Sequence, residues 1–348
     1  MRGLFGRRRR DEGTATAVAE PPAGYDGSDV ELEAEISRLT ERAREQAGLE
    51  DERELIRLRN EVGIRRLRGA SGVASFADAA AALPAGDRLP EFTRDQVTPE
   101  LLRSAIMRDG CLLVRGLVPR ADAKWFAQQI GRTFAERDRH DAGEPHDARL
   151  YEEFTPDPRY GEELARPWIK AGGGVLAVDS PLLNFKMMEL FAQARLPELV
   201  GGYLGEAPLI TAQKTTLRTA EPSVPGAWHQ DGKFMGPVRA LNLWLSLSHC
   251  GDDAPGLDIV PKRIDEFVTT QTDEALLDYA ISQRMAEDAA GATGILRPIF
   301  APGDALLFDD VFLHKTGSDP DMPKPRYAIE NWFFGGSGFP QEYAPIAV

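Results

Sequence analysis

The amino-acid sequence predicts an α+β protein whose second half is an antiparallel sandwich or barrel. Residues 239–249 carry the clearest signal, because four leucines alternate there with Asn, Trp and Ser, which is the period of a strand with different surroundings on its two faces. After Pro208, turn residues separate several short runs of this kind. Residues 28–70, in contrast, place apolar side chains at helical spacing.

The N-terminal part is predicted to consist of a tail, a helical extension and a linker. Residues 1–27 are rich in Gly, Ala, Pro and charge, and we expect a disordered tail there. Ser28 and Glu31 have the spacing of a capping box, which predicts that a helix begins at Ser28. The charged helical extension, residues 28–70, has two roles open to it: packing on the main domain, or self-association. Residues 70–90 are rich in Ala, Gly and Pro and predict a linker.

The main domain is predicted to span residues 89–348. Its first part combines a strand with helices and an irregular stretch at 137–180, which is long enough to predict functional loops. Its second part consists of strands with one inserted helix. The predicted helices are 98–107, 120–136, 183–194, 197–204 and 273–288. The predicted strands are 111–117, 210–218, 239–249, 256–260, 304–308 and 326–334.

The composition argues against several classes of protein. A net charge of −14 at pH 7 argues against a general nucleic-acid binder, which needs a basic face to neutralise phosphates. Cys111 and Cys250 are the only cysteines, which predicts neither a disulfide framework nor a thiolate zinc site. No apolar run reaches the length of a membrane span, and the first residues lack the apolar stretch of a secretory signal. We therefore expect a cytoplasmic protein without nucleic-acid or membrane partners.

The segment WHQD at residues 228–231 is the strongest local signal for chemistry. Residues two apart in an extended segment point to the same side, so His229 and Asp231 can converge on one point. His314 follows a turn and a predicted strand that would deliver it to the same place. Two histidines and one carboxylate on one face of an octahedral metal form the facial triad of iron(II) oxygenases, which leaves coordination positions open. A structural zinc site would fill them with protein ligands.

Arg326 strengthens this interpretation. It lies twelve residues after His314, at the start of the next predicted strand. A guanidinium group is suited to holding a carboxylate through two hydrogen bonds in a partly buried site. Glu330 shares a face with Arg326 if the strand is regular, which predicts a buried carboxylate near this arginine.

These residues lie in segments that resemble the phytanoyl-CoA dioxygenase-like branch of the iron(II)/2-oxoglutarate-dependent oxygenases. The resemblance covers roughly residues 109–334, through DGCLLVRGL, AWHQD, ALNLWLSLSHCGDDAPGLDIVP, PGDALLFDDVFLH and PRYAIENWFF. It implies a double-stranded β-helix, a distorted, cupin-like jelly roll with flanking helices. It also implies that His229, Asp231 and His314 bind iron(II), and that Arg326 pairs with the distal carboxylate of 2-oxoglutarate.

The resemblance implies further contacts to the co-substrate from neighbouring strands. Arg218 with Thr216 stands where the family commonly has a lysine, Lys214 competes for that role, and Asn242 stands where the family has a small polar residue. Solvent-facing polar residues on an edge strand are the alternative for each of these positions. The sequence departs from the family at Lys262 and Arg263, where members often have Gly-Ser-His, and this puts substrate binding in doubt but not the triad.

The activity that the resemblance implies is that of a dioxygenase consuming 2-oxoglutarate and O2. Such an oxidoreductase releases succinate and CO2 and hydroxylates a small organic substrate, with ascorbate as an assisting reductant. Related halogenases lack the carboxylate ligand, so Asp231 favours hydroxylation; no catalytic residue is predicted beyond the metal ligands. Two alternatives stay open: a jelly-roll metalloenzyme that does not use 2-oxoglutarate, and a non-catalytic binding module on the same scaffold. The substrate cannot be read from the sequence.

Overall fold

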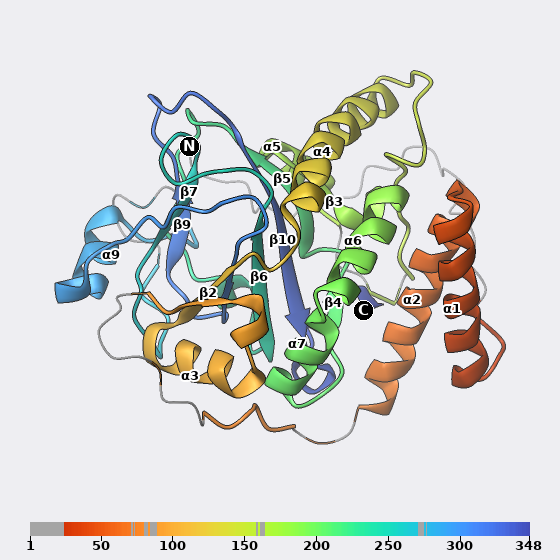
Figure 1. Cartoon of the computed structure of the whole chain (residues 1–348), viewed down its shortest axis with the longest axis horizontal. Helices are drawn as coiled ribbons and strands as arrows, with labels where there is room; N and C mark the ends of the chain where they lie inside the picture. Colours follow the sequence, from red (N-terminus) through yellow and green to blue (C-terminus); the bar gives the residue numbers. More distant parts are fainter. Residues whose placement is uncertain are drawn as a thin grey trace, which may run out of the picture.

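A computed structural model describes residues 24–70, 72, 74–79, 83, 89–157, 159–160, 164–270, 275 and 277–348. The predicted tail lies outside the described residues except for 24–27, and so does much of the predicted linker. The described chain is a mixture of helices and strands, with two sheets in the centre and helices around them (Figure 1).

The larger sheet is built around β10 (Arg326–Phe334), its longest strand. Along β10 run three antiparallel partners, β4 (Leu209–Thr211), β5 (Thr215–Ala220) and β6 (Ala240–Ser246). The main strand order is β1-β2-β8-β6-β10-β4-β11, and β3 and β5 extend the sheet beside β10. The other strands are β1 (Glu91–Thr93), β2 (Cys111–Arg115), β3 (Gly174–Leu176), β8 (Ala305–Phe308) and β11 (Pro345–Ala347).

The smaller sheet pairs β7 (Gly256–Ile259) with β9 (His314–Gly317). Its buried Leu257 and Ile259 belong to one apolar cluster with Trp244, Phe308 and Trp332 of the larger sheet. The two sheets therefore share a core. Trp244, which packs against Arg326, belongs to this core.

Strand β6 has the two environments that its alternation predicts. Leu241, Leu243, Leu245 and Leu247 lie in a second apolar cluster together with buried residues of the covering helices. Asn242 and Trp244 face the other side, and every residue of the strand is buried. The helices are α3 (Pro99–Asp109), α4 (Arg120–Asp141), α6 (Pro181–Gln193) and α7 (Leu196–Leu204), with α5 (Arg166–Ala171) inside the stretch predicted to be irregular.

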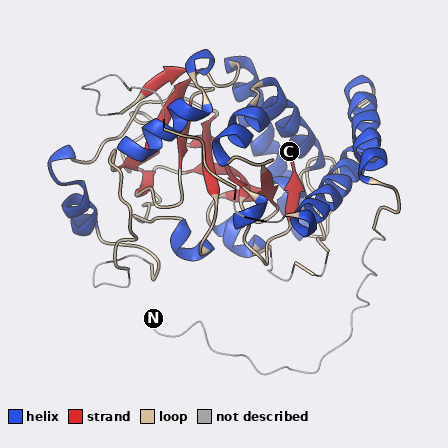
Figure 2. Cartoon of the chain, turned by 90° about the horizontal axis from the view of Figure 1, so that it is seen from below, coloured by secondary structure: helices blue, strands red, loops and turns tan. Residues whose placement is uncertain are grey.

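The N-terminal helices α1 (Asp29–Glu45) and α2 (Leu49–Gly69) lie at the side of the molecule opposite α9 (Gln283–Ala290) (Figures 1 and 2). Ser28 and Glu31 form the predicted capping box. Asn60 of α2 donates a hydrogen bond of 2.7 Å to the carbonyl of Pro345 in β11. A Cβ on Gly63 would lie 2.9 Å from that proline's backbone, so only glycine allows this approach. Of the two roles left open, the structure shows packing on the main body.

Two predicted elements need correction, and a strand at the site was not predicted. The strand predicted at 210–218 is two strands, because a turn separates Thr211 from Thr215, in which Oγ1 of Thr211 accepts a hydrogen bond of 2.9 Å from the amide of Lys214. Of the helix predicted at 273–288, residues 273, 274 and 276 lie outside the described residues, and in the described part the helix begins at Gln283, where the Ser282 hydroxyl caps it. Strand β9, which begins with His314, was not predicted.

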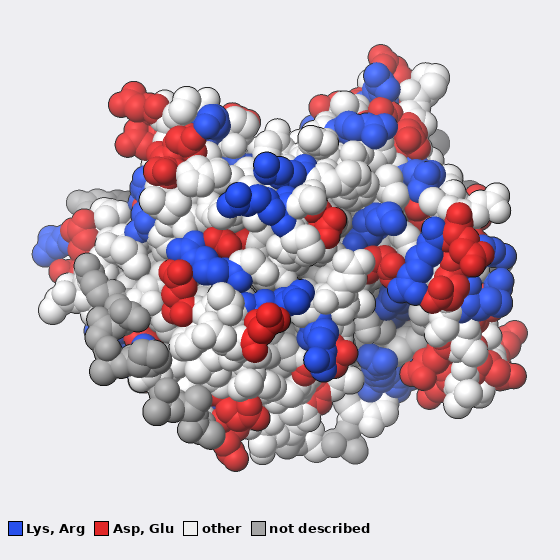
Figure 3. Space-filling model, viewed as in Figure 1, with Lys and Arg blue, Asp and Glu red and all other residues white. Residues whose placement is uncertain are grey.

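On the face shown in Figure 3, Lys and Arg are interspersed with Asp and Glu, most densely along α1 and α2. Among the described residues, no helix is both long enough and apolar enough to cross a membrane.

Candidate metal centre

His229 and His314 are held side by side by the backbone. Their segments form an isolated antiparallel bridge at these two residues. The amide of His229 donates to the carbonyl of His314 at 3.0 Å, and the amide of His314 donates back at 3.2 Å. His314 is also paired with Ile259 of β7, so the smaller sheet fixes the backbone positions of both histidines.

Asp231 reaches the same point although only its N-terminal neighbours Trp228 and His229 lie in extended bridges, because Asp231 itself has helical dihedral angles at the start of α8 (Gly232–Met235). The intervening Gln230 points away and ties neighbouring loops together, donating to the carbonyl of Val311 at 2.6 Å and accepting from the amide of Val268 at 2.8 Å. Gly232, the residue after Asp231, must be small. A Cβ on Gly232 would lie 2.5 Å from Oδ2 of Asp310 and 2.7 Å from the ring of Phe267.

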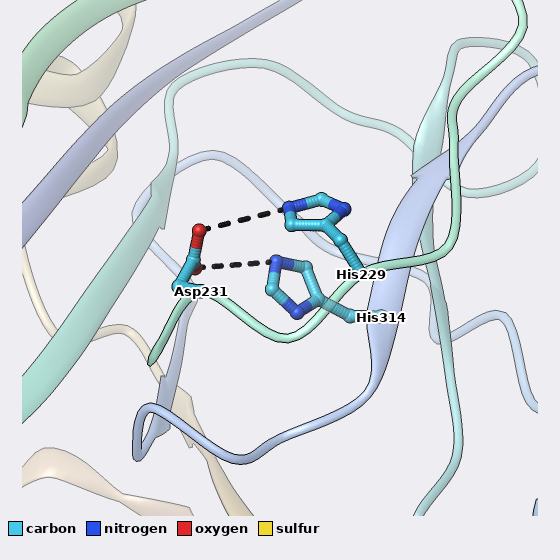
Figure 4. A group of neighbouring side chains, drawn as sticks. All are labelled: His229, Asp231 and His314. Carbon is cyan, nitrogen blue, oxygen red and sulfur yellow. Dashed lines mark ion pairs between the residues drawn. The ribbon is translucent and has the colours of Figure 1, made fainter. Parts of the chain in front are cut away.

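The three side chains converge with their ligand atoms facing one another (Figure 4). Nε2 of His229 lies 3.7 Å from Oδ1 of Asp231, and Nε2 of His314 lies 3.8 Å from Oδ2. These separations are too long for hydrogen bonds. They suit a shared ion, because two ligand atoms each about 2.1 Å from one metal can be at most about 4.2 Å apart.

Both imidazoles are oriented by backbone carbonyls. Nδ1 of His229 lies 2.7 Å from the carbonyl of Ala227, and Nδ1 of His314 lies 3.1 Å from that of Phe312. A carbonyl only accepts, so each Nδ1 carries the proton and each Nε2 keeps a lone pair. Burial, with the nearby His229 adding to it, lowers the pKa of His314 to about 4. This imidazole is therefore neutral at pH 7, as a metal ligand must be.

The loop before His314 is fixed by an ion pair. Asp309 is buried and pairs with Arg263, one of the two residues at which the sequence departs from the resembling family. The Asp309 side chain therefore helps to hold the turn that leads to His314. The sequence did not predict this pair, because Asp309 and Arg263 are far apart along the chain.

Arg326 is the largest fully buried side chain among the described residues. None of its three side-chain nitrogens has a hydrogen-bond partner. Its guanidinium lies 5.0 Å from the ring centre of Trp244, whose own Nε1 is buried without a partner. Burial lowers the pKa of Arg326, yet a guanidinium keeps its proton in proteins. The structure thus places a buried cation with unused donors on the inner face of the larger sheet.

The other residues predicted to contact the co-substrate share this face. Register pairs Thr216 with Glu330 and Asn242 with Trp332, and directly paired residues point to the same side. Both are buried, and Oδ1 of Asn242 has no hydrogen-bond partner. Arg218, however, is already engaged, donating from Nε to Glu330 at 2.5 Å and from Nη1 to the carbonyl of Gly172 at 2.6 Å.

Lys214, the competing candidate, contacts an aromatic ring beside the triad. Its ammonium stands 4.3 Å from the ring centre of Phe234 in α8 (Gly232–Met235). Phe234 in turn stacks beside His229, with the ring centres 6.5 Å apart, and meets Tyr279 edge to face at 5.6 Å. These aromatic rings therefore flank the triad. Sequence reasoning did not find them, because they come from segments without a motif.

A second group of potential ligands, His249, Asp252 and Asp253, differs from the triad. Its histidine and Asp252 are exposed, and His249 is already 2.7 Å from Asp252. This is the geometry of a surface ion pair.

Comparisons with known proteins place these features in context. No family model matches the chain. Over 148 residues the chain is 24% identical to an L-proline trans-4-hydroxylase of Streptomyces griseoviridis, and the match covers 36% of this chain and 55% of that enzyme. The chain thus spans about half the length of this curated relative. The structure of EctD from S. alaskensis with 2-oxoglutarate and 5-hydroxyectoine is similar in fold, with a TM-score of 0.51 and 18% identity, over 76% of this chain and 84% of that one.

Proposed function

We propose that the protein is an iron(II)/2-oxoglutarate-dependent oxygenase that hydroxylates a small organic substrate. The observation that carries the proposal is the pairing of two unsatisfied groups in one core. The triad presents three ligand atoms to a common point, and Arg326 presents buried donors that no group of the described chain satisfies. A metalloenzyme without an anionic co-substrate would have no use for such an arginine.

The residues present fit the metal. His229 and His314 would bind it through Nε2, since Nδ1 of each is committed to a carbonyl, and Asp231 would bind it through a carboxylate oxygen. Iron(II) bound there, together with 2-oxoglutarate and O2, supplies the oxidising chemistry, in which the co-substrate becomes succinate and CO2. The protein contributes the fixed imidazole orientation and the charge of Asp231, whose presence favours hydroxylation over halogenation.

The residues present also fit the co-substrate. A carboxylate beside Arg326 would accept hydrogen bonds from donors that are otherwise buried and unsatisfied, which removes the cost of leaving them so. The ring of Trp244 packs against the guanidinium of Arg326, and its Nε1 is a further donor in the same region. Asn242 and Thr216 would line the space between Arg326 and the triad. Arg218 would act on the co-substrate indirectly, through its hydrogen bond to Glu330.

The similar proteins support this reading. The curated relative is an L-proline trans-4-hydroxylase, and the EctD structure contains 2-oxoglutarate and 5-hydroxyectoine. The two facing sheets favour a distorted double-stranded β-helix, and the sequence segments favour the phytanoyl-CoA dioxygenase-like branch. We include in the proposal the division into a helical extension, 28–70, and an oxygenase domain, 89–348. A cytoplasmic location and a role of α1 and α2 in self-association stay predictions.

The test is succinate formation from 2-oxoglutarate. Purified protein with iron(II), ascorbate and 2-oxoglutarate should form succinate, and a matching substrate found by screening small organic molecules should increase the rate. His229→Ala should reduce the yield to the level of protein-free controls. Equal yields from the wild type and His229→Ala would overturn the assignment.

A further inference from the structure

Glu330 lies between two arginines on the inner face of the larger sheet. Its Oε2 accepts a hydrogen bond of 2.5 Å from Nε of Arg218 on β5, and its Oε1 lies 3.7 Å from Nη2 of Arg326. The first contact is a charge-assisted hydrogen bond, whereas the second is too long to be one. Glu330 is therefore the nearest carboxylate to the buried guanidinium, but its hydrogen bond goes to the other arginine.

In this position the negative charge of Glu330 opposes the binding of an anion at Arg326. An anion arriving at Arg326 would stand close to Glu330, and two carboxylates at short range repel each other where water is scarce. Arg326 is fully buried and the Glu330 side chain is about a quarter exposed, so solvent screens this repulsion only in part. A hydrogen-bonded cation on the far side of Glu330 offsets that charge. Arg218 is such a cation.

Arg218 is itself held in place. The carbonyl of Gly172, which ends α5, accepts from its Nη1 at 2.6 Å. A Cβ on Gly172 would lie 2.9 Å from the same nitrogen, so glycine lets the guanidinium approach this carbonyl without shifting. The loop after α5 thus fixes Arg218 against Glu330.

We propose that Arg218 is a positioning residue that draws Glu330 away from Arg326, and that this pair sets how tightly the buried arginine binds the carboxylate of 2-oxoglutarate. The proposal rests on the proposed function. It differs from the contact expected from the sequence, in which Arg218 touches the co-substrate itself. Here Arg218 acts through Glu330, and Glu330 opposes binding.

The two roles of Arg218 make opposite predictions for a double variant. If Arg218 contacts 2-oxoglutarate, its loss cannot be repaired by changing Glu330. If Arg218 restrains Glu330, removal of the glutamate charge makes the arginine unnecessary. The experiment is calorimetric titration of 2-oxoglutarate into protein loaded with zinc(II), which replaces iron(II) and prevents turnover. The proteins are the wild type, Arg218→Met, Glu330→Gln and the double variant.

We expect Arg218→Met to weaken 2-oxoglutarate binding by about tenfold, and Glu330→Gln to strengthen it by about threefold to tenfold. The double variant should bind within about threefold of the wild type. Glu189→Gln is the matched control, because Glu189 of α6 pairs with Arg44 of α1. This variant should bind 2-oxoglutarate with the affinity of the wild type. Thermal unfolding of each protein shows whether it is folded.

Three outcomes would overturn the inference. A double variant that binds as weakly as Arg218→Met shows a direct contact, and a Glu330→Gln protein that binds more weakly than the wild type shows that Glu330 assists binding. Both leave the proposed function intact. A wild-type protein that binds no 2-oxoglutarate removes the proposed function, and this inference with it.

Discussion

The α1–α2 pair and the metal centre both contain many charged side chains, but they satisfy them in opposite ways. On α1 and α2, half-exposed arginines pair with carboxylates of the same chain, as Arg38 does with Glu35 and Arg53 with Glu152. In the metal centre Arg326 is fully buried and has no hydrogen-bond partner. Exposed pairs add little stability, whereas a buried cation without hydrogen bonds lowers it. The charges of the helical pair are therefore satisfied within the chain, while the centre is arranged for groups that the chain does not supply.

The largest expected effect contrasts the two histidine clusters. His314→Ala removes a ligand from the buried triad, so binding of iron(II) should weaken greatly and succinate formation should fall to background. His249→Ala changes only an exposed pair with Asp252, so both properties should stay at wild-type values. Metal analysis after dialysis and a succinate assay measure the two. Similar losses in both variants would contradict the assignment of the metal to the triad.

The next effect separates binding from stability at Arg326. Arg326→Met should weaken 2-oxoglutarate binding by at least about a hundredfold, because the buried charge partner of the carboxylate is lost. The melting temperature of the metal-loaded protein without 2-oxoglutarate should hold or rise, since a fully buried cation without hydrogen bonds is removed. Arg38→Met, on an exposed helix, should change neither quantity. If Arg326→Met unfolds the protein, Arg326 has a structural role instead.

A smaller effect concerns the contact between α2 and the body. Glu52 is fully buried, and Arg149 holds both of its oxygens at 2.6 and 2.9 Å. Arg149→Ala leaves this carboxylate buried without its partner, so the free energy of unfolding should fall by about 1–3 kcal/mol. Urea denaturation followed by circular dichroism measures the change. A value near zero would mean that water reaches Glu52.

The smallest effect is expected at the next residue of the same helix. Arg53 pairs with Glu152, and both side chains are more than a third exposed. Arg53→Ala should therefore change the free energy of unfolding by less than about 0.5 kcal/mol. The same denaturation experiment provides the comparison. Equal losses in Arg149→Ala and Arg53→Ala would remove the distinction between buried and exposed pairs on which the argument rests.

The sequence predicted what local patterns determine. The alternation around Trp244 gave strand β6 and its two faces, and the HQD spacing brought His229 and Asp231 to one side. The capping box at Ser28 located the start of α1. Each depends on residues within a few positions of one another, where periodicity and hydrogen-bonding rules act directly.

What the sequence could not provide depends on the register between distant segments. The sequence predicted Arg218 as a co-substrate ligand, but it could not show that strand pairing places this arginine against Glu330 on β10. Asp309 reads as part of a solvated turn until the fold brings Arg263 to it. The absence of partners around Arg326 is likewise a property of the packed core, since a buried side chain can be counted as unsatisfied only when all its neighbours are known.

The central claim is that the triad and Arg326 together support oxidation by O2 with 2-oxoglutarate as the co-substrate. The most direct measurement is the isotopic composition of succinate formed by the iron-loaded wild type under labelled O2. The proposed function predicts succinate that carries one labelled oxygen atom, formed together with CO2, and none from the His314→Ala protein. Succinate without the label, or equal amounts from both proteins, would contradict it.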